Sequence, residues 1–201
     1  MRNRKYLGLV VALIALGAAS AFAALQFTNI TYWAINATKP PVEKYAGTDA
    51  AAYPSNIAVK SYTLSNGVNA TYIYILGYTG DITNYSNALK VCNYYGSTSY
   101  TVSIQYVGPV GGSYTSYVNQ FMVYNSANPS QWVGFTYSGA SNAGPVQVAT
   151  LAPGQCVTLG VSVLVSGDLP STAYSSSVGA AVPPTSYLAE YQVNIIMSPL
   201  T

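Results

Sequence analysis

Very few side chains in this sequence could perform acid–base, nucleophilic or metal chemistry. The chain of 201 residues contains no histidine, five Asp or Glu residues and two cysteines. General acid–base catalysis and metal binding draw mainly on histidine or on clustered carboxylates, and no two of the acids lie within three residues of each other. We therefore expect no enzyme, no metal site and no cofactor. A spatial pairing of Asp81 with Asp168 or Glu190 is the one catalytic arrangement that stays open.

The two cysteines are predicted to form a disulfide bond. Cys92 and Cys156 are the only thiols, and neither has a histidine or a second cysteine beside it. In an exported chain, two cysteines most simply pair with each other. Cys92 alternates out of step with Leu89 and Val91, as Cys156 does with the apolar series that begins at Val157. Both cysteines are therefore expected to leave the core face, where they could bridge two neighbouring strands.

Four Asn-x-Ser/Thr triplets are candidate acceptors for N-linked glycans. They begin at Asn29, Asn36, Asn69 and Asn84. Some triplets arise by chance in a sequence so rich in Asn, Ser and Thr. We expect one or more of them to be used, and the sequence alone does not say which.

Residues 1–23 have the three parts of a secretory signal peptide. A basic start over residues 2–5 precedes an apolar run over 7–19, and Ala-Phe-Ala at 21–23 supplies a small-x-small cleavage site. The apolar run is shorter than the ~20 residues that cross a bilayer, so we expect the leader to be removed after secretion. The alternative is a type IV pilin leader that is cut near residues 6–8, with the apolar helix retained in a filament core.

Removal of the leader would also change the charge balance. The whole chain has a formal charge of +2, but residues 24–201 contain four lysines, five acids and no arginine, which gives −1. A nucleic-acid partner needs many cations and is therefore excluded. The remaining chain is rich in Ser, Thr, Asn and Tyr, which is typical of an extracellular β-protein. We expect an extracellular protein that makes no membrane contact once the leader is cleaved.

Apolar residues with a period of two predict β-strands along the rest of the chain. The clearest series covers 157–165. Similar or weaker runs lie at 56–64, 70–79, 86–94, 102–106, 117–124, 131–137, 146–148 and 187–195. Gly, Pro and Asn clusters separate the runs, and no window outside the leader shows a convincing helical period. This pattern predicts an all-β fold, an antiparallel jelly-roll-like β-sandwich over residues 39–201, with long surface connections at 36–55 and 167–185.

Residues 24–38 form the most distinctive segment of the mature chain. The stretch 24–35 is uncharged and rich in aromatic and β-branched residues, and Lys39-Pro40-Pro41 follows it closely. A long apolar strand is an aggregation hazard unless it is paired. It either folds back into its own sandwich or adds as a donor strand to an edge or groove of the next subunit. Head-to-tail contacts of the second kind do not close, so they build a fibre.

The anchors expected on a donor strand are its large apolar side chains. These are Leu25, Phe27, Ile30, Tyr32, Trp33 and Ile35. Strict alternation would place a glycan on Asn29 on the same face as Phe27 and Trp33. Either Asn29 is unmodified or a bulge near 28–29 switches the phase, and we prefer the bulge.

The order of these features resembles that of TasA-like secreted fibre subunits and the related archaeal bundling-pilus and thread subunits. The resemblance rests on the leader followed at once by Ala-Ala-Leu-Gln-Phe at 23–27, on Leu89–Gly96 leading into Tyr100–Ile104, and on Leu-Ala-Pro-Gly at 151–154 before a strand. It implies a jelly-roll subunit, often glycosylated, that donates its N-terminal strand to an identical subunit in an extracellular, cell-surface filament, with lateral contacts between filaments. A type IV pilin-like subunit and a monomeric secreted module that binds sugar or cell wall are the alternatives.

Overall fold

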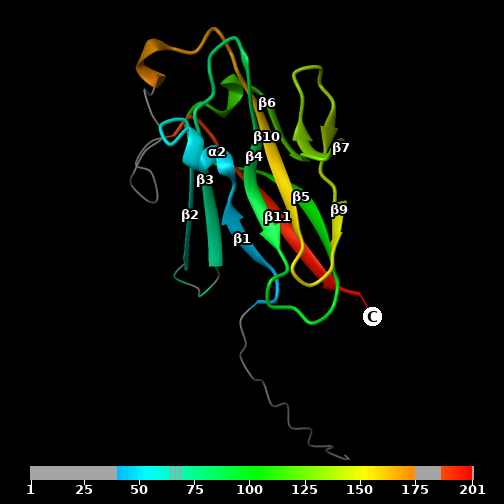
Figure 1. Cartoon of the computed structure of the whole chain (residues 1–201). Coiled ribbons are helices and arrows are strands. Elements are labelled where there is room, and N and C mark those ends of the chain that lie inside the picture. The colour runs from blue at the N-terminus through cyan, green and yellow to red at the C-terminus, as the bar shows by residue number, and fades with distance from the viewer. Residues whose placement is uncertain (1–39, 64, 66, 68, 175–186, 201) are drawn as a thin grey trace, which may run out of the picture. The chain divides into compact units, whose positions relative to one another are not determined.

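The computed structural model describes residues 40–63, 65, 67, 69–174 and 187–200, and most of them lie in β-strands (Figure 1). The strands are β1 (Glu43–Ala46), β2 (Ile57–Thr63), β3 (Asn69–Ile75), β4 (Ile82–Cys92), β5 (Tyr100–Gly111), β6 (Val118–Asn125), β7 (Asn128–Phe135), β8 (Ser141–Asn142), β9 (Val146–Leu151), β10 (Cys156–Val165) and β11 (Glu190–Pro199). One short helix, α2 (Thr48–Ala52), and two 3-10 turns, η1 (Thr115–Tyr117) and η2 (Ser171–Ala173), complete the described elements.

The predicted leader and donor segment lie outside the described residues. This applies to Leu25, Phe27, Asn29, Ile30, Tyr32, Trp33, Ile35 and Asn36. Their roles stay predictions.

Three antiparallel sheets confirm the predicted all-β sandwich. The first has six strands in the order β1-β4-β10-β6-β7-β8, the second has the order β11-β5-β9, and the third pairs β2 with β3. Side chains from the six-stranded sheet pack against side chains from both smaller sheets in two core clusters. The second layer of the sandwich is therefore made of two separate pieces. Jelly-roll connectivity stays a prediction.

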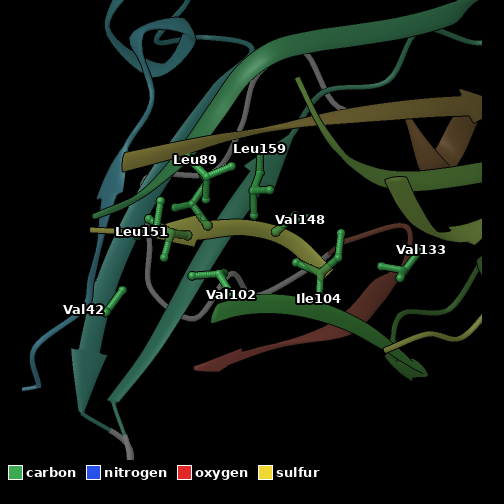
Figure 2. Close-up of a cluster of buried hydrophobic side chains, with 10 residues drawn as sticks. Val42, Leu89, Val102, Ile104, Val133, Val148, Leu151 and Leu159 are labelled. Atoms are coloured by element: carbon green, nitrogen blue, oxygen red, sulfur yellow. The ribbon is translucent and has the colours of Figure 1, made fainter. Parts of the chain in front are cut away.

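The core follows from the two-residue apolar period of the central strands. In β10, the five apolar residues that alternate over 157–165 are all at most 8% exposed, as the sequence predicted. Val157 and Leu159 pack in one cluster with the completely buried Val102 and Ile104 of β5, and the other three pack in the second cluster. Figure 2 shows Leu89 and Leu159 of the six-stranded sheet beside Leu151 of β9 in the same cluster.

The predicted surface connection at 36–55 is wrong in part, whereas the described part of the one at 167–185 has no strand and is largely exposed. Within 36–55, β1 pairs with the end of β4, and Val42 just before it is 2% exposed. Within 167–185, η2 forms and Leu169 is buried. A four-residue strand is too short to show a period, so the sequence gives no detectable signal for β1.

The predicted disulfide between Cys92 and Cys156 is present. The two residues lie opposite each other in the register of β4 and β10, with their Cα atoms 4.0 Å apart. Cys156 is exposed as expected, but Cys92 is only 1% exposed. Cys92 lies between two strands, with Glu43 of β1 as its register partner on the other side. Both cysteines leave the core face as expected, because their neighbours Val91 and Val157 are the residues that pack in the first core cluster. Cys92 is nevertheless buried, because it lies on a strand with neighbours on both sides.

Candidate functional site: unpaired strand edges

The two pieces of the second layer each leave a strand edge without a strand partner. Within the described residues, β3 pairs only with β2, and β11 pairs only with β5. Both strands nevertheless cover the same core. Ile73 of β3 packs against both clusters, Val193 of β11 packs against the first, and Tyr191 packs against the second. The strands β3 and β11 thus lie over one core in the same layer without being hydrogen-bonded to each other.

The unpaired edge of β3 is the one nearer to β11. On its other side β3 pairs with β2, and β2 in turn contacts β1 and α2 at the margin of the six-stranded sheet. Tyr187 lies three residues before β11. Its pKa is raised, first by a hydrogen bond to Glu190 and to a smaller extent by its proximity to Tyr72 of β3.

The two strands run in opposite directions. Ile75 at the end of β3 and Tyr191 near the start of β11 pack against the same second cluster. Val193 and Ile195, further along β11, pack against the first cluster. A single strand placed between β3 and β11 would therefore be parallel to one and antiparallel to the other.

The edges of β3 and β11 carry little protection against strand addition. Natural edge strands are commonly protected by charged residues, prolines or bulges. The seven residues of β3 include no charged residue and no proline. In β11, both register shifts lie between Glu190 and Val193, and its single proline, Pro199, is the last residue of the strand. The stretch from Val193 to Ser198 is thus regular and uncharged.

Strand β9 is different, because buried amide groups from other elements bond to its backbone. Asn125 of β6 is 7% exposed, and its Nδ2 donates a hydrogen bond to the carbonyl oxygen of Val148 at 2.9 Å. Asn93 is completely buried, and its Nδ2 donates to the carbonyl oxygen of Leu151 at 3.0 Å. Two carbonyl groups of β9 therefore bond to side chains from outside its sheet.

An aromatic cluster fixes the first half of β11 to the six-stranded sheet. The ring of Tyr191 lies 4.7 Å from Phe121 of β6 and 5.5 Å from Phe135 of β7, measured between centroids. Tyr106 of β5 lies 6.1 Å from Tyr191. Burial raises the pKa of Tyr191 to about 12. Sequence reasoning did not single out this tyrosine, because tyrosines occur throughout the strands.

The two glycan acceptors within the described residues are both exposed. Asn69 is the first residue of β3, and its Oδ1 accepts a hydrogen bond from Thr63 Oγ1 at 2.9 Å across the β2–β3 hairpin. Asn84 lies on β4, where its neighbours Thr83 and Tyr85 are buried. Asn84 therefore points away from the core, on the outer face of the six-stranded sheet.

Membrane-crossing helices and metal-binding clusters are both missing from the described residues. None of the helices there is long and apolar enough to cross a membrane. In the same part of the chain, no group of three or more His, Cys, Asp or Glu side chains could hold a metal ion. A comparison with known protein families and with curated proteins finds no match for this chain. An antiparallel β-sandwich with a divided second layer and unpaired strand edges is the feature of the described residues on which a function can be based.

Proposed function

We propose that the chain is a structural subunit of an extracellular filament. Residues 24–35 of one subunit would add as a strand between β3 and β11 of the next subunit, after removal of the leader at residue 23. The observation that supports this proposal is the pair of unpaired edges over one core. Each subunit both donates a strand and accepts one, so assembly would continue head to tail and produce a fibre.

The chemistry of the donor segment suits this position. Its backbone could form hydrogen bonds on both sides, since both neighbouring edges lack a strand partner in the described structure. With the bulge near 28–29, Phe27 before it and Ile30 and Tyr32 after it would point at the core. At about 25 cal/mol per Å² of apolar area, a few hundred Å² would contribute on the order of 10 kcal/mol. The cost of ordering the free strand must be subtracted from this figure.

A matched pair of proline variants tests the acceptor edge. Ile196 and Met197 are consecutive, similarly exposed at 38% and 39%, and lie in the regular part of the β11 register. Successive N–H groups of a strand point to opposite edges, and proline removes one N–H. One of Ile196→Pro and Met197→Pro therefore breaks a bond to β5, whereas the other removes a donor only from the unpaired edge.

We expect the variant that breaks a bond to β5 to lower the thermal midpoint of unfolding. The variant that removes a donor only from the unpaired edge should fold normally but fail to form filaments in electron micrographs. If both variants fold and both polymerise like the wild type, then β11 is not the acceptor edge.

Three experiments on the N-terminal segment test the proposal against its alternatives. N-terminal sequencing of the secreted protein should begin at Ala24, whereas Leu7 or Gly8 would indicate a pilin. Deletion of 24–35 should leave a folded monomer on size-exclusion chromatography. A monomeric binding module would instead run as a monomer with its full N-terminus, and would lose its fold on deletion. Trp33→Asp should weaken polymerisation more than folding, because Trp33 would be buried only at the subunit junction.

A further inference from the structure

A shallow trough lies on the outer face of the six-stranded sheet, away from the β3 and β11 edges. We call it the outer trough. Its lining comes from four strands and from the turn between β7 and β8, and includes Asn84, Gln120, Met122, Tyr124, Tyr137 and Ser162. None of the residues that line it is charged.

The strand register explains why this face is hollowed. Asn84, Ser162, Met122 and Gly134 are consecutive register partners across β4, β10, β6 and β7. Ser162 is small, and Gly134 adopts a φ of +119° that favours glycine. In Gly134 a β-carbon would collide with the carbonyl oxygen of Phe121. At Ser162 and Gly134 little side chain therefore projects from the outer face of the sheet.

The floor and one wall of the trough are polar and aromatic. Gln120 Nε2 donates a hydrogen bond to Ser162 Oγ at 2.7 Å, and both residues are only 5% exposed. The ring of Tyr124 lies over Gly160, where an added β-carbon would come within 2.5 Å of it. Across the trough, Tyr137 on the β7–β8 turn is 66% exposed. Neutral amides, hydroxyls and aromatic faces can contact both the hydroxyl groups and the apolar faces of sugar rings.

We propose that Asn84 carries an N-linked glycan whose first sugars lie in the outer trough. Asn84 opens the acceptor triplet Asn84-Tyr85-Ser86. The exposed Asn84 and Ser86 flank the buried Tyr85, so the triplet presents its acceptor side chains outward. Asn84 is both an acceptor and part of the lining, which means that a glycan there would begin inside the trough. The proposal needs secretion but does not depend on filament formation.

The modification itself is a transfer from an oligosaccharide linked to a lipid phosphate. The bond between sugar C1 and the phosphate oxygen breaks, and a bond forms between C1 and Nδ2 of Asn84. The lipid phosphate leaves with the bonding electron pair and takes up the proton that the amide loses. Asn84 then keeps one N–H, and its charge stays zero.

Single-residue variants of the full chain, produced in a host that glycosylates secreted proteins, identify the acceptor. The two described acceptors fall between Lys60 and Lys90, within one tryptic peptide, so peptide mass alone cannot distinguish them. Ser86→Ala removes the Asn84 triplet but keeps the Ser86 carbonyl oxygen, which accepts a hydrogen bond from Ser126 Oγ. Thr71→Ala removes the Asn69 triplet as the matched control.

The intact mass should fall by one glycan in Ser86→Ala and in Asn84→Gln. The Asn84 glycan should persist in Thr71→Ala. An intact mass that changes only by the amino-acid substitution in both Ser86→Ala and Asn84→Gln would overturn the proposal.

A double-variant cycle tests the place of the glycan. In the wild-type background, Ser86→Ala should lower the thermal midpoint by about 2 °C or more, as expected for a modest lost contact in a domain of this size. In a Tyr137→Ser background, where one wall is missing, we expect less than half of that shift. Equal shifts in the two backgrounds would show that the glycan does not pack against Tyr137 and would overturn its placement in the trough.

Discussion

Reduction of the Cys92–Cys156 bond should remove a large part of the stability of this domain. The bond closes a loop with a sequence separation of 64 residues. In the chain-entropy model, opening a loop of this length lowers the free energy of the unfolded chain by about 4 kcal/mol. Total stabilities of domains are roughly 5–15 kcal/mol, so this bond would supply a substantial share. The folded register need not change, because β4 and β10 also pair along most of their length.

Denaturant unfolding of the oxidised and the reduced wild-type protein measures this effect. The reduced protein keeps both sulfur atoms and therefore most of the packing around Cys92, which is 1% exposed. A Cys92→Ala, Cys156→Ala double variant adds the loss of buried volume and serves as the comparison. The slope of the unfolding free energy against denaturant concentration should also be steeper after reduction, because the unfolded chain expands and exposes more surface. A free energy of unfolding that differs by less than about 1 kcal/mol between the two redox forms would refute the entropic reasoning.

Two further predictions concern buried polar groups. Asn93→Ala should lower the free energy of unfolding by roughly 2–4 kcal/mol, because Asn93 Nδ2 donates to the carbonyl oxygens of Thr98 and Leu151. The exposed Asn128→Ala should change the urea-unfolding free energy by less than about 0.5 kcal/mol, and equal losses in the two variants would contradict the prediction. Since the pKa of Tyr191 is about 12 in the fold against 10.0 for an unperturbed tyrosine, the unfolded chain loses this proton first. Stability should therefore fall as the pH rises from about 10 to about 12, and Tyr191→Phe should show a smaller fall in pH-dependent unfolding experiments. An identical pH dependence in wild type and Tyr191→Phe would show that Tyr191 is not the cause.

The sequence predicted the strands well where burial imposes a repeated period. The apolar series of β10 gave both the strand and its core face, because every second residue faces the same cluster. The cysteine pair could be predicted because the chain has only two cysteines, and the structure places them opposite each other on neighbouring strands. By contrast, β1 is too short to show a period. Asn93 and Asn125 look like any surface asparagine until the fold buries them.

The divided second layer could not be predicted from local patterns. The alternation of apolar residues in β3 and β11 resembles that in β5, because all three strands cover a core on one face. Which strands pair with each other depends instead on long-range contacts. The sequence did single out residues 24–35 as a strand in need of a partner, but it gave no indication of where an acceptor would lie.

The contrast between the strand edges strengthens the case that the divided layer has a purpose. Unpaired edges usually invite aggregation, and proteins protect them. This chain does so at β9, where the fully buried Asn93 and the nearly buried Asn125 bond to its carbonyl groups. Burying an amide is costly unless it is hydrogen-bonded, so these side chains are suited to closing an edge. Over the same core, the regular parts of β3 and β11 carry neither charge nor such amide caps from Asn93 or Asn125. A strand added between β3 and β11 would find hydrogen-bonding edges on both sides, and head-to-tail addition of this kind would build a linear polymer.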